Sequence, residues 1–256
     1  MIPFLKFQAQ GNDFVFFNEA TLSEKDLSKF ARIVLDRHFG VGGDTLVIHN
    51  DDGPSLRFFN SDGSEAEICV NSLLCYGFYM REFKKNLRGE ITVKTKSGER
   101  TILLDGDISV FIPFKNFECQ PVSLELSGLQ AKGYYTTSIG NPHFVILEDF
   151  PFEYAGQIET HGYFPERTNV NYLKITEEGV LHRVWERGVG ETLSCASGAL
   201  SSFGVLRKIL GFKESALFIS KGGILRIREG KEHLIVSGNP SFVYMGYITS
   251  TSSLKK

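Results

Sequence analysis

Two stretches of this chain carry the same small pattern around a cysteine. In each, a polar residue that ends a strand-like run stands nine residues before the cysteine, Asn60 before Cys69 and Glu186 before Cys195. Small or polar residues and an apolar run follow both cysteines. Two Gly-Asn pairs repeat at nearly the same interval, since 129 residues separate the pairs and 126 separate the cysteines. Features kept in register over half a chain predict a tandem duplication in which each copy has the size of a domain.

Length and charge bound the class of protein. A chain of 256 residues can form one large domain or two of ordinary size. A net charge of −2 gives no general attraction to nucleic acid or to an anionic membrane, so we expect neither as a partner. No apolar stretch approaches the roughly 20 residues that span a bilayer, and the first residues lack the layout of a signal peptide. We therefore expect a cytoplasmic enzyme or binding protein.

The four cysteines differ in what their positions indicate. They stand at positions 69, 75, 119 and 195, without the close C-x-x-C spacing of a metal site, so no metal is expected. Reduced thiols are expected in a chain of this size that has no secretion signal. We interpret Cys75 and Cys119 as structural, because most cysteines are buried. The matched spacing of Cys69 and Cys195 instead favours a chemical role.

The pattern of apolar residues predicts many strands and three helices. Strand-like runs fall at 14–17, 46–48, 56–59, 109–112, 144–147, 181–185, 234–236 and 242–244. Helices are predicted at 23–37, with Ser23 as the N-cap, and at 70–84 and 198–210. The last two are apolar on nearly all sides, which predicts that they are buried all round. We expect an α+β fold of two pseudo-symmetric halves, each a β-layer closed around a central helix.

The domain boundaries follow from the same reading. The first half is expected to cover residues 1–117 together with a returning C-terminal strand at about 242–256, and to contain Cys69. The second half is expected at residues 118–241 and contains Cys195. The segment 115–135 is expected to be the crossover between them.

A cysteine at the start of a helix is well placed for acid–base chemistry. A free thiol titrates near ~8.5, and the partial positive charge and unpaired N–H groups of a helix N-terminus lower its pKa. The same N–H groups bind a carboxylate and stabilise the charge that builds on it when an α-proton leaves. Two such helix ends facing one substrate would let one thiolate accept the proton while the opposite thiol donates one. Inversion of the carbon would follow without a metal or another cofactor.

Other polar residues have simpler interpretations. On the residues alone, His143 is expected to be a hydrogen-bonded core histidine, and Glu186 with Arg187 could form an ordinary surface ion pair. Four asparagines could be turn residues, namely Asn12, Asn60, Asn141 and Asn169. The glycine-rich segment 40–44 lacks the lysine of a phosphate-binding loop and opens no clear helix, so nucleotide binding is not expected.

Five motifs together resemble the diaminopimelate epimerases. They are Gly11-Asn12-Asp13-Phe14, Phe59-Asn60-Ser61-Asp62-Gly63-Ser64-Glu65, Gly140-Asn141-Pro142-His143, Arg167-Thr168-Asn169-Val170-Asn171 and Trp185-Glu186-Arg187-Gly188-Val189-Gly190-Glu191-Thr192. The motifs follow the order of the family and cover nearly the whole chain. The resemblance implies an isomerase that interconverts LL- and meso-2,6-diaminopimelate without a cofactor, on the route to lysine. It also implies two α/β halves with the site between them.

The resemblance also implies a role for individual residues. Cys69 and Cys195 would be the acid/base pair, and His143 and Glu186 would tune the two thiols. The backbone amides of Val70, Asn71, Ala196 and Ser197 would hold the reacting carboxylate. The other substrate-binding residues would be Asn12, Thr45, Asn60, Asn141, Asn169, Glu186 and Arg187, where an arginine suits a carboxylate and a glutamate suits an ammonium group. Tyr244 is similar in position to a tyrosine at the family's dimer interface, so a homodimer is implied.

The chain departs from the family pattern next to both cysteines. Val70-Asn71-Ser72 stands where the family usually has Gly-Asn-Gly, and Ala196-Ser197-Gly198 stands where it usually has Gly-Thr-Gly. Thr45 stands where some members have a substrate-contacting glutamine. These differences keep two alternatives open, a racemase for another amino acid on the same two thiols and a non-catalytic amino-acid binder.

Overall fold

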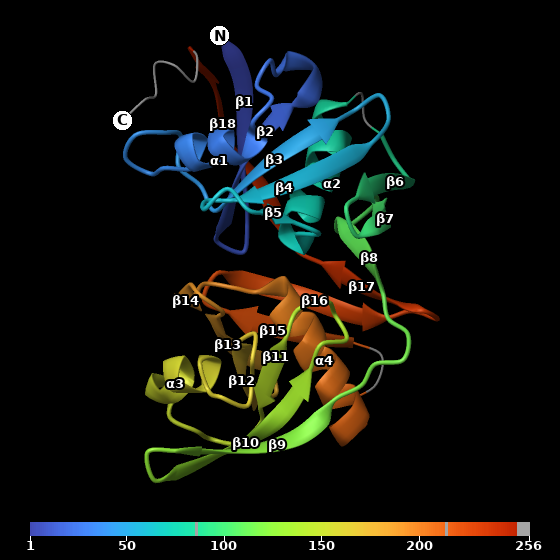
Figure 1. Cartoon of the computed structure of the whole chain (residues 1–256). Helices are drawn as coiled ribbons and strands as arrows, with labels where there is room; N and C mark the ends of the chain where they lie inside the picture. Colours follow the sequence, from blue (N-terminus) through green and yellow to red (C-terminus); the bar gives the residue numbers. More distant parts are fainter. Residues whose placement is uncertain (85–86, 213–214, 250–256) are drawn as a thin grey trace. The chain divides into compact units, whose positions relative to one another are not determined.

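The computed structural model describes residues 1–84, 87–212 and 215–249. The chain divides into two compact units (Figure 1). Unit 1 consists of Met1–Val110 and the end of the chain from Gly238 on, and unit 2 consists of Phe111–Ser237. Unit 1 is therefore built from both ends of the sequence, and unit 2 is the continuous segment between them.

Unit 1 is a mixed sheet with two helices. Its strands are β1 (Ile2–Ala9), β2 (Asn12–Asn18), β3 (Thr45–Asn50), β4 (Ser55–Asn60), β5 (Glu65–Ala66), β6 (Glu90–Thr95), β7 (Gly98–Leu103), the start of β8 (Ser109–Pro113) and β18 (Pro240–Ile248). The strands pair in the order β18-β1-β2-β3-β4-β6-β7-β8, and β5 also pairs with β4. The β2–β3 and β4–β6 pairs are parallel, and the others are antiparallel. The helices are α1 (Leu27–Val34) and α2 (Val70–Phe83), and α2 contacts β1, β7 and β18.

Unit 2 repeats this arrangement strand for strand. Its strands are β9 (Gln120–Leu126), β10 (Leu129–Thr136), β11 (His143–Ile146), β12 (Asn169–Ile175), β13 (Val180–Glu186), β14 (Gly190–Thr192), β15 (Ser215–Ser220), β16 (Gly223–Glu229) and β17 (His233–Ser237). They pair in the order β9-β10-β11-β12-β13-β15-β16-β17, and β14 also pairs with β13. Again only the third and fifth pairs in this order, β11–β12 and β13–β15, are parallel. The recurrence of the pairing order accounts for the offset repeats in the sequence.

The helices of unit 2 occupy corresponding places along the chain. The short α3 (Ala155–Glu159) lies between β11 and β12, as α1 lies between β2 and β3. The long α4 (Ala196–Leu210) follows β14, as α2 follows β5, and it contacts β11, β12 and β16 (Figure 1). Most residues in the first three turns of α2 and α4 are buried, because the small and apolar side chains predicted there leave almost no polar face.

The predicted helix boundaries were close for the two cysteine-linked helices and wrong for the first helix. The helix predicted at 70–84 ends at Phe83, and the one predicted at 198–210 starts two residues earlier, at Ala196. The first helix starts at Leu27, and its N-cap is Asp26, whose carboxylate accepts from the backbone N–H of Lys29, rather than Ser23. Both residue types cap helices, but it is the side chain of Asp26 that accepts from a first-turn N–H, and Phe30, Ala31 and Val34 then form the buried face of the shorter helix.

The segment 115–135 is not a simple crossover. It contains β9 and most of β10, which form an antiparallel hairpin with Leu126 opposite Leu129. Val122, Leu124 and Leu126 alternate with exposed residues along β9, and this two-residue period is the signal that the prediction missed. The buried face of the hairpin joins the core of unit 2 with Phe144 and Ile158.

Candidate active site

Cys195 forms the N-cap of α4 and lies in a buried polar environment. Its backbone is extended, with φ −133° and ψ 110°, and Ala196 begins the helix. The backbone N–H of Gly198 donates to its sulfur at 3.4 Å, and the hydroxyl of Ser197 lies 3.4 Å from the same sulfur. Only 7% of the residue is exposed. The local fold therefore places the Cys195 thiol at the start of a helix, as the sequence predicts.

The pKa of Cys195 shows that burial outweighs the helix N-terminus. Burial raises the pKa of this thiol well above its ordinary range, and the nearby carboxylate of Glu186 raises it further. The hydrogen bonds from Ser197 and Gly198 act in the opposite direction but are smaller. The helix start does lower this pKa through the N–H of Gly198, as expected, but the net direction is upward, because the cost of removing a thiolate from water exceeds the stabilisation from the two hydrogen bonds. Cys195 is a protonated thiol at neutral pH.

His143 is connected to Cys195 through Ser197. It begins β11 and is fully buried, and its Nε2 lies 3.2 Å from the hydroxyl of Ser197. Its Nδ1 lies 3.1 Å from the amide nitrogen of Asn171 on β12. Burial, with the charges of His182 and Arg187, lowers the pKa of His143 to about 3, so the imidazole is neutral. His143 is both a core histidine and part of the surroundings of Cys195.

The other predicted residues of unit 2 lie at one edge of its sheet. Asn141 precedes β11, Asn169 starts β12 opposite His143, and Glu186 ends β13. The side chain of Asn169 donates to Pro142 O at 2.8 Å and accepts from the backbone N–H of Arg187 at 3.0 Å. The hydroxyl of Thr192 donates to Glu186 at 2.5 Å. Arg187 donates to the carbonyl of Glu166 at 2.9 Å, which orients its guanidinium.

The predicted residues of unit 1 occupy the corresponding edge of that sheet. Asn12 starts β2, Thr45 starts β3, and Asn60 ends β4 directly opposite Thr45. Asn12 donates to Asp44 at 2.8 Å, and Asn60 donates to the hydroxyl of Ser64 at 2.9 Å. Thr45 is buried, whereas Asn60 is exposed.

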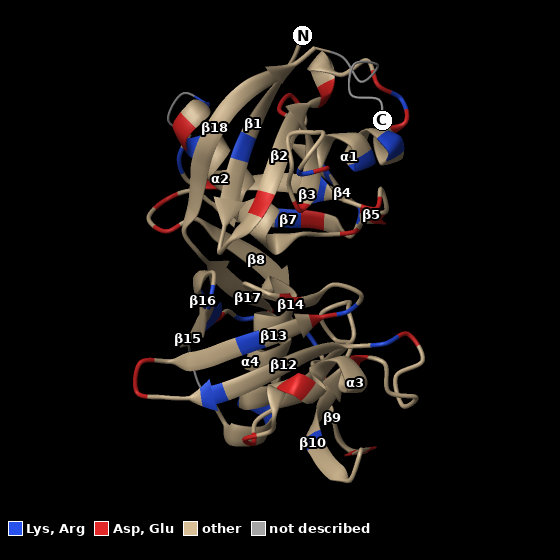
Figure 2. Ribbon diagram, turned by 90° about the vertical axis from the view of Figure 1, so that its left-hand side faces the viewer, with Lys and Arg blue, Asp and Glu red and all other residues tan. Residues whose placement is uncertain are grey.

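An ion-pair network holds the start of β2. Lys6 on β1 and Asp13 on β2 form an ion pair at 2.7 Å, and Figure 2 shows the two charges on neighbouring strands. Arg37 pairs with Asp13 at 2.7 Å and with Asp44 at 2.8 Å. Burial alone would raise the pKa of Asp13, but the hydrogen bonds from Arg37 and Lys6 lower it to about 2. This network fixes Asp44, which in turn fixes Asn12.

Cys69 repeats the position of Cys195 in unit 1. It is the N-cap of α2 with φ −138° and ψ 107°, and it is half-buried. Its carbonyl accepts from the N–H of Leu73 and from the hydroxyl of Ser72. Val70 and Asn71 begin the helix and are buried, and in the described part of the chain the buried Oδ1 of Asn71 has no hydrogen-bond partner. The helix start beside Cys69 thus has an unused polar atom.

Two residues that were given no role from the sequence lie near Cys195. Asn171, which the motifs contain without a role, and His182 on β13 are buried and hydrogen-bonded to each other. A signal for His182 exists in the alternation of β13, where it lies on the buried face with Val180 and Val184. The contact between residues from separate strands has no signal in one sequence.

Within residues 1–84, 87–212 and 215–249, no group of three or more His, Cys, Asp or Glu side chains is arranged to hold a metal ion. No helix in the same part of the chain has the length and apolarity needed to cross a membrane.

Comparison with known proteins decides the family. The family model described as diaminopimelate epimerase matches residues 4–111 and 135–243. The chain belongs to the diaminopimelate epimerase family. A diaminopimelate epimerase of Methanococcus maripaludis strain C6 is 33% identical, covering 96% of this chain and 99% of the relative. A diaminopimelate epimerase of Carboxydothermus hydrogenoformans is 35% identical, covering 96% of this chain and 98% of the relative.

Solved structures support the fold of this epimerase family member. A phenazine biosynthesis protein of the PhzF family from Enterococcus faecalis has a TM-score of 0.74 at 14% identity, covering 96% of this chain and 99% of that one. A probable proline racemase from Agrobacterium radiobacter K84 has a TM-score of 0.68 at 11% identity, covering 97% and 93%. The predicted α+β, diaminopimelate epimerase-like fold is confirmed.

Proposed function

We propose that this protein is a diaminopimelate epimerase that inverts one α-carbon to interconvert the LL and meso forms. The observation that carries the proposal is family membership along the whole chain, with relatives of that name at 33% and 35% identity. Both cysteines are retained, and each is the N-cap of a long buried helix. We propose that the enzyme acts in the cytoplasm, on the route to lysine. We also propose that it works without pyridoxal phosphate.

The proposed reaction needs only two thiols. One cysteine acts as a thiolate and takes the α-proton, forming an S–H bond as the C–H bond breaks. The electron pair left on carbon is delocalised into the adjacent carboxylate, and the other cysteine then gives its thiol proton to the opposite face of the carbon. We assign these roles to Cys69 and Cys195.

Cys195 has neighbours suited to both protonation states. Glu186 disfavours the thiolate, so it supports the form that donates a proton. The hydroxyl of Ser197 and the N–H of Gly198 are donors that favour the thiolate, so they support the form that accepts one. A residue that must both gain and lose a proton in each catalytic cycle requires both kinds of neighbour.

We propose that the helix starts bind the reacting carboxylate. The backbone N–H groups of Val70 and Asn71 on α2, and of Ala196 and Ser197 on α4, belong to the first turn of each helix, which has no acidic residue. The partial positive charge there also stabilises the negative charge that develops during proton transfer. We further propose that each helix is enclosed by the sheet of its own unit, which would keep water from this step.

The distal amine and carboxylate of the substrate would be bound by the polar sheet edges. We assign this role to Asn12, Thr45, Asn60, Asn141, Asn169, Glu186 and Arg187. Arg187 presents a planar fork that matches a carboxylate, and its contact with Glu166 O restricts how the fork can turn. A glutamate and several asparagines supply acceptors for the distal ammonium group.

A racemase for a different amino acid is the second candidate function. The specific observation is Val70, which is buried at the first position of α2, where the family usually has glycine. Its branched side chain occupies space beside Cys69 that a glycine would leave open. The third possibility, a non-catalytic binder, would be excluded by any turnover that Cys69→Ala abolishes.

Incubation with LL-diaminopimelate in heavy water tests the proposed function. We expect meso product with deuterium at the inverted carbon, loss of turnover by a factor of about a thousand or more in Cys69→Ala and in Cys195→Ala, and retained turnover in Cys119→Ala. A panel of other amino acids is followed in parallel for solvent deuterium uptake. Deuterium uptake by another amino acid alone would show that this amino acid, not diaminopimelate, is the substrate. No deuterium uptake by any amino acid would favour the non-catalytic binder.

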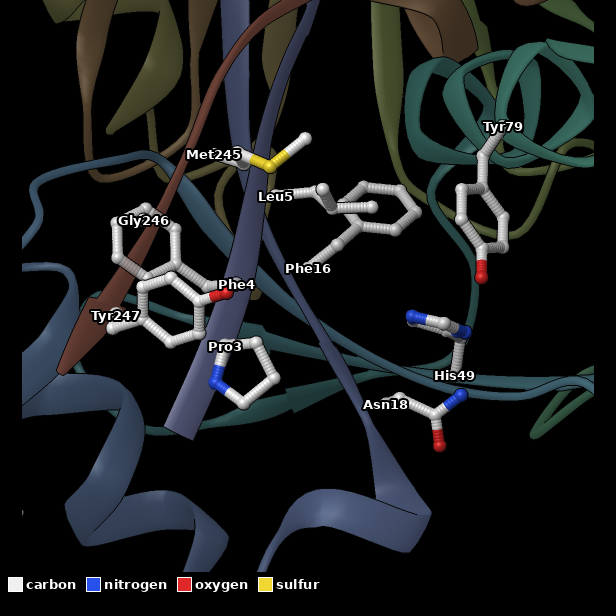
Figure 3. Close-up of a pocket in the computed structure, with 10 residues that line it drawn as sticks. All are labelled: Pro3, Phe4, Leu5, Phe16, Asn18, His49, Tyr79, Met245, Gly246 and Tyr247. Carbon is white, nitrogen blue, oxygen red and sulfur yellow. The ribbon is translucent and has the colours of Figure 1, made fainter. Parts of the chain in front are cut away.

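We also propose that the protein is a homodimer joined through β18. Val243, Met245 and Tyr247 alternate along this strand and are 51%, 59% and 64% exposed. Figure 3 shows Met245 and Tyr247 among the residues that line a largely apolar pocket, together with Phe4 and Leu5. Tyr244, on the other face, is 42% exposed and packs edge-on against Phe4. An exposed apolar stripe beside a pocket is typical of a surface that a partner covers.

A further inference from the structure

A continuous chain of polar contacts runs from Cys195 into the interior of unit 2. Beyond Ser197 and His143, the amide nitrogen of Asn171 lies 3.1 Å from His143 Nδ1. The Oδ1 of Asn171 lies 3.0 Å from His182 Nε2, and the hydroxyl of Ser220 lies 3.4 Å from His182 Nδ1. The members therefore come from the start of α4 and from strands β11, β12, β13 and β15.

The direction of each hydrogen bond follows from the chemistry of the groups. The amide nitrogen of Asn171 also donates to the carbonyl oxygen of Phe144 at 3.4 Å, and a carbonyl can only accept, so this contact fixes which end of the amide is the nitrogen. Burial lowers the pKa of His143 to about 3 and that of His182 to about 4, so both rings are neutral and carry one N–H each. His143 must accept from Asn171 at Nδ1, which leaves its proton on Nε2, facing Ser197.

The packing of α4 holds the amide in this orientation. Gly198 lies directly against Asn171, and a Cβ at this glycine would come within 2.3 Å of Asn171 Oδ1. On the other side, His182 supplies the N–H that Oδ1 accepts, and the ring of His182 is packed edge-on against Phe218. A flipped amide would place Asn171 Oδ1 against the carbonyl oxygen of Phe144, which brings two acceptors together at a buried site where an unmade hydrogen bond is costly.

We infer that Asn171 is a positioning residue, supported by His182 and Ser220, that holds His143 as the Nε2–H tautomer so that the Ser197 hydroxyl donates its proton to the Cys195 sulfur. His143 donates to the oxygen of Ser197, so the hydroxyl proton of Ser197 is directed to the sulfur 3.4 Å away. Every donor in this series of hydrogen bonds then points toward Cys195. The inference rests on the proposed role of Cys195 as an acid/base residue.

This series of hydrogen bonds would stabilise the Cys195 thiolate, which its surroundings otherwise disfavour. Cys195 is buried beside Glu186, and both conditions disfavour the thiolate that proton abstraction requires. A hydroxyl that another N–H already polarises is a stronger donor to an anion than an isolated one. In the opposite tautomer, His143 Nε2 would accept a hydrogen bond from the Ser197 hydroxyl. The lone pairs of the Ser197 oxygen would then face the Cys195 sulfur.

The first test needs no variant. In the full-length protein labelled with nitrogen-15, ring nitrogen shifts from long-range proton–nitrogen spectra distinguish the two neutral tautomers of a histidine. We expect His143 with its proton on Nε2, and likewise His182. His161, whose Nδ1 accepts from the N–H of Tyr163 at 3.1 Å, serves as an internal reference for the same tautomer. A proton on Nδ1 of His143 would overturn the inference whatever the substrate proves to be.

The second test uses variants of Ser197 and Asn171. Ser197→Ala removes the hydroxyl, and we expect alkylation of Cys195 by iodoacetamide, followed by mass spectrometry at fixed pH, to slow about tenfold. Ser197→Thr keeps a hydroxyl and should restore most of the rate. Asn171→Asp offers only acceptors, so we expect the proton of His143 to move to Nδ1 and the alkylation rate to fall by at least as much.

A matched control and a kinetic readout complete the design. Ser202→Ala removes a buried hydroxyl from the same helix for which the described structure records no hydrogen-bond partner, and it should leave the rate unchanged. In turnover, Ser197→Ala and Asn171→Asp should lower kcat about tenfold with KM changed less than about twofold. An unchanged alkylation rate in Ser197→Ala would overturn the inference. Failure to epimerise diaminopimelate would instead overturn the proposed function, because the tautomer and alkylation measurements use no substrate.

Discussion

At the scale of single residues, Cys195 is defined by neighbours with opposite effects on its proton. Burial and Glu186 raise the pKa of its thiol, and the donors Ser197 and Gly198 lower it. The balance favours the protonated form, but Glu186 is the one contributor that a single substitution can remove without opening the core. The carboxylate therefore offers a direct way to measure how strongly the site controls this proton.

Glu186→Gln should lower the pKa of Cys195. The substitution keeps the size of the side chain but removes the negative charge that disfavours the thiolate, so the thiolate forms at lower pH. We expect the pH profile of Cys195 alkylation to shift down by about one unit or more. Epimerase turnover should fall as well, because Glu186 is proposed to bind the substrate.

Glu191→Gln is the matched control for this measurement. Glu191 lies on β14 and is paired with Arg183 and Lys221, with contacts of 2.6 Å and 2.7 Å, and it is not among the main contributors to the pKa of Cys195. The pH profile of Cys195 alkylation in Glu191→Gln should match that of the unaltered protein. An identical profile in Glu186→Gln and Glu191→Gln would show that the Glu186 charge does not act on Cys195.

At the scale of elements, α4 has different requirements at its two ends. Its first turn carries Cys195 and the donors around it, and its last turn ends at Gly211, which adopts a left-handed conformation with φ 66° and ψ 26°. The N–H of Gly211 bonds to the carbonyl of Arg207 and closes the helix. The first end carries the proposed acid/base residue, and the second end is closed by a left-handed glycine.

Gly211→Ala should destabilise the protein without affecting the site. No atom lies within 4 Å of the position that a Cβ would take, so the only cost is the left-handed backbone, about 1 kcal/mol in the free energy of unfolding. Urea unfolding measures this difference, and epimerase turnover at 25 °C should be unchanged.

Gly162→Ala is the control for Gly211→Ala. This glycine of unit 2 also has open space around its Cβ position, but its φ is not in the left-handed region. Its substitution should be neutral or slightly stabilising, because alanine restricts the unfolded chain. Equal stabilities of the two variants would contradict the conformational explanation.

The sequence predicted those parts of the fold that depend on short-range patterns. The helix starts at Cys69 and Cys195 were predicted because strand-like runs, small residues and apolar segments follow one another within about fifteen positions. The hairpin of β9 and β10 was missed although β9 alternates regularly, because in β10 a glycine occupies one of the buried positions and only Ala131 before it is apolar and buried. The series of polar contacts that connects Cys195 to Ser220 joins residues of five elements, so only the folded structure places these residues together. The high pKa of Cys195 likewise depends on burial, which outweighs the local helix effect.

At the scale of the whole molecule, β18 links the end of the chain to its beginning. It pairs with β1 along nearly its full length, from Ile248 opposite Ile2 to Pro240 opposite Ala9. Gly246 allows this close pairing, because a Cβ there would come within 2.7 Å of the ring of Phe4. The same strand carries the exposed apolar stripe, so its role in closing unit 1 and its proposed role in binding a second copy are expected to depend on each other.

Met245→Glu should convert the proposed dimer into a monomer. A carboxylate in the middle of the stripe would be buried without a partner in the dimer but remains solvated in the monomer. Analytical ultracentrifugation measures the outcome. Ile224→Glu, at an apolar residue of β16 that is 47% exposed, should leave the dimer intact. A dimer that persists in Met245→Glu would place the interface elsewhere.

The return of the chain to β1 also bears on how the protein is made. While a ribosome is still extending the polypeptide, residues 1–110 have already been synthesised, but unit 1 cannot be completed until residues 240–248 follow. During that time β1 lacks one of its two neighbours, because β18 is formed by residues 240–248. The half of the enzyme that is translated first is therefore completed only when residues 240–248 are available, and chains truncated before residue 240 would leave an open strand edge that invites aggregation.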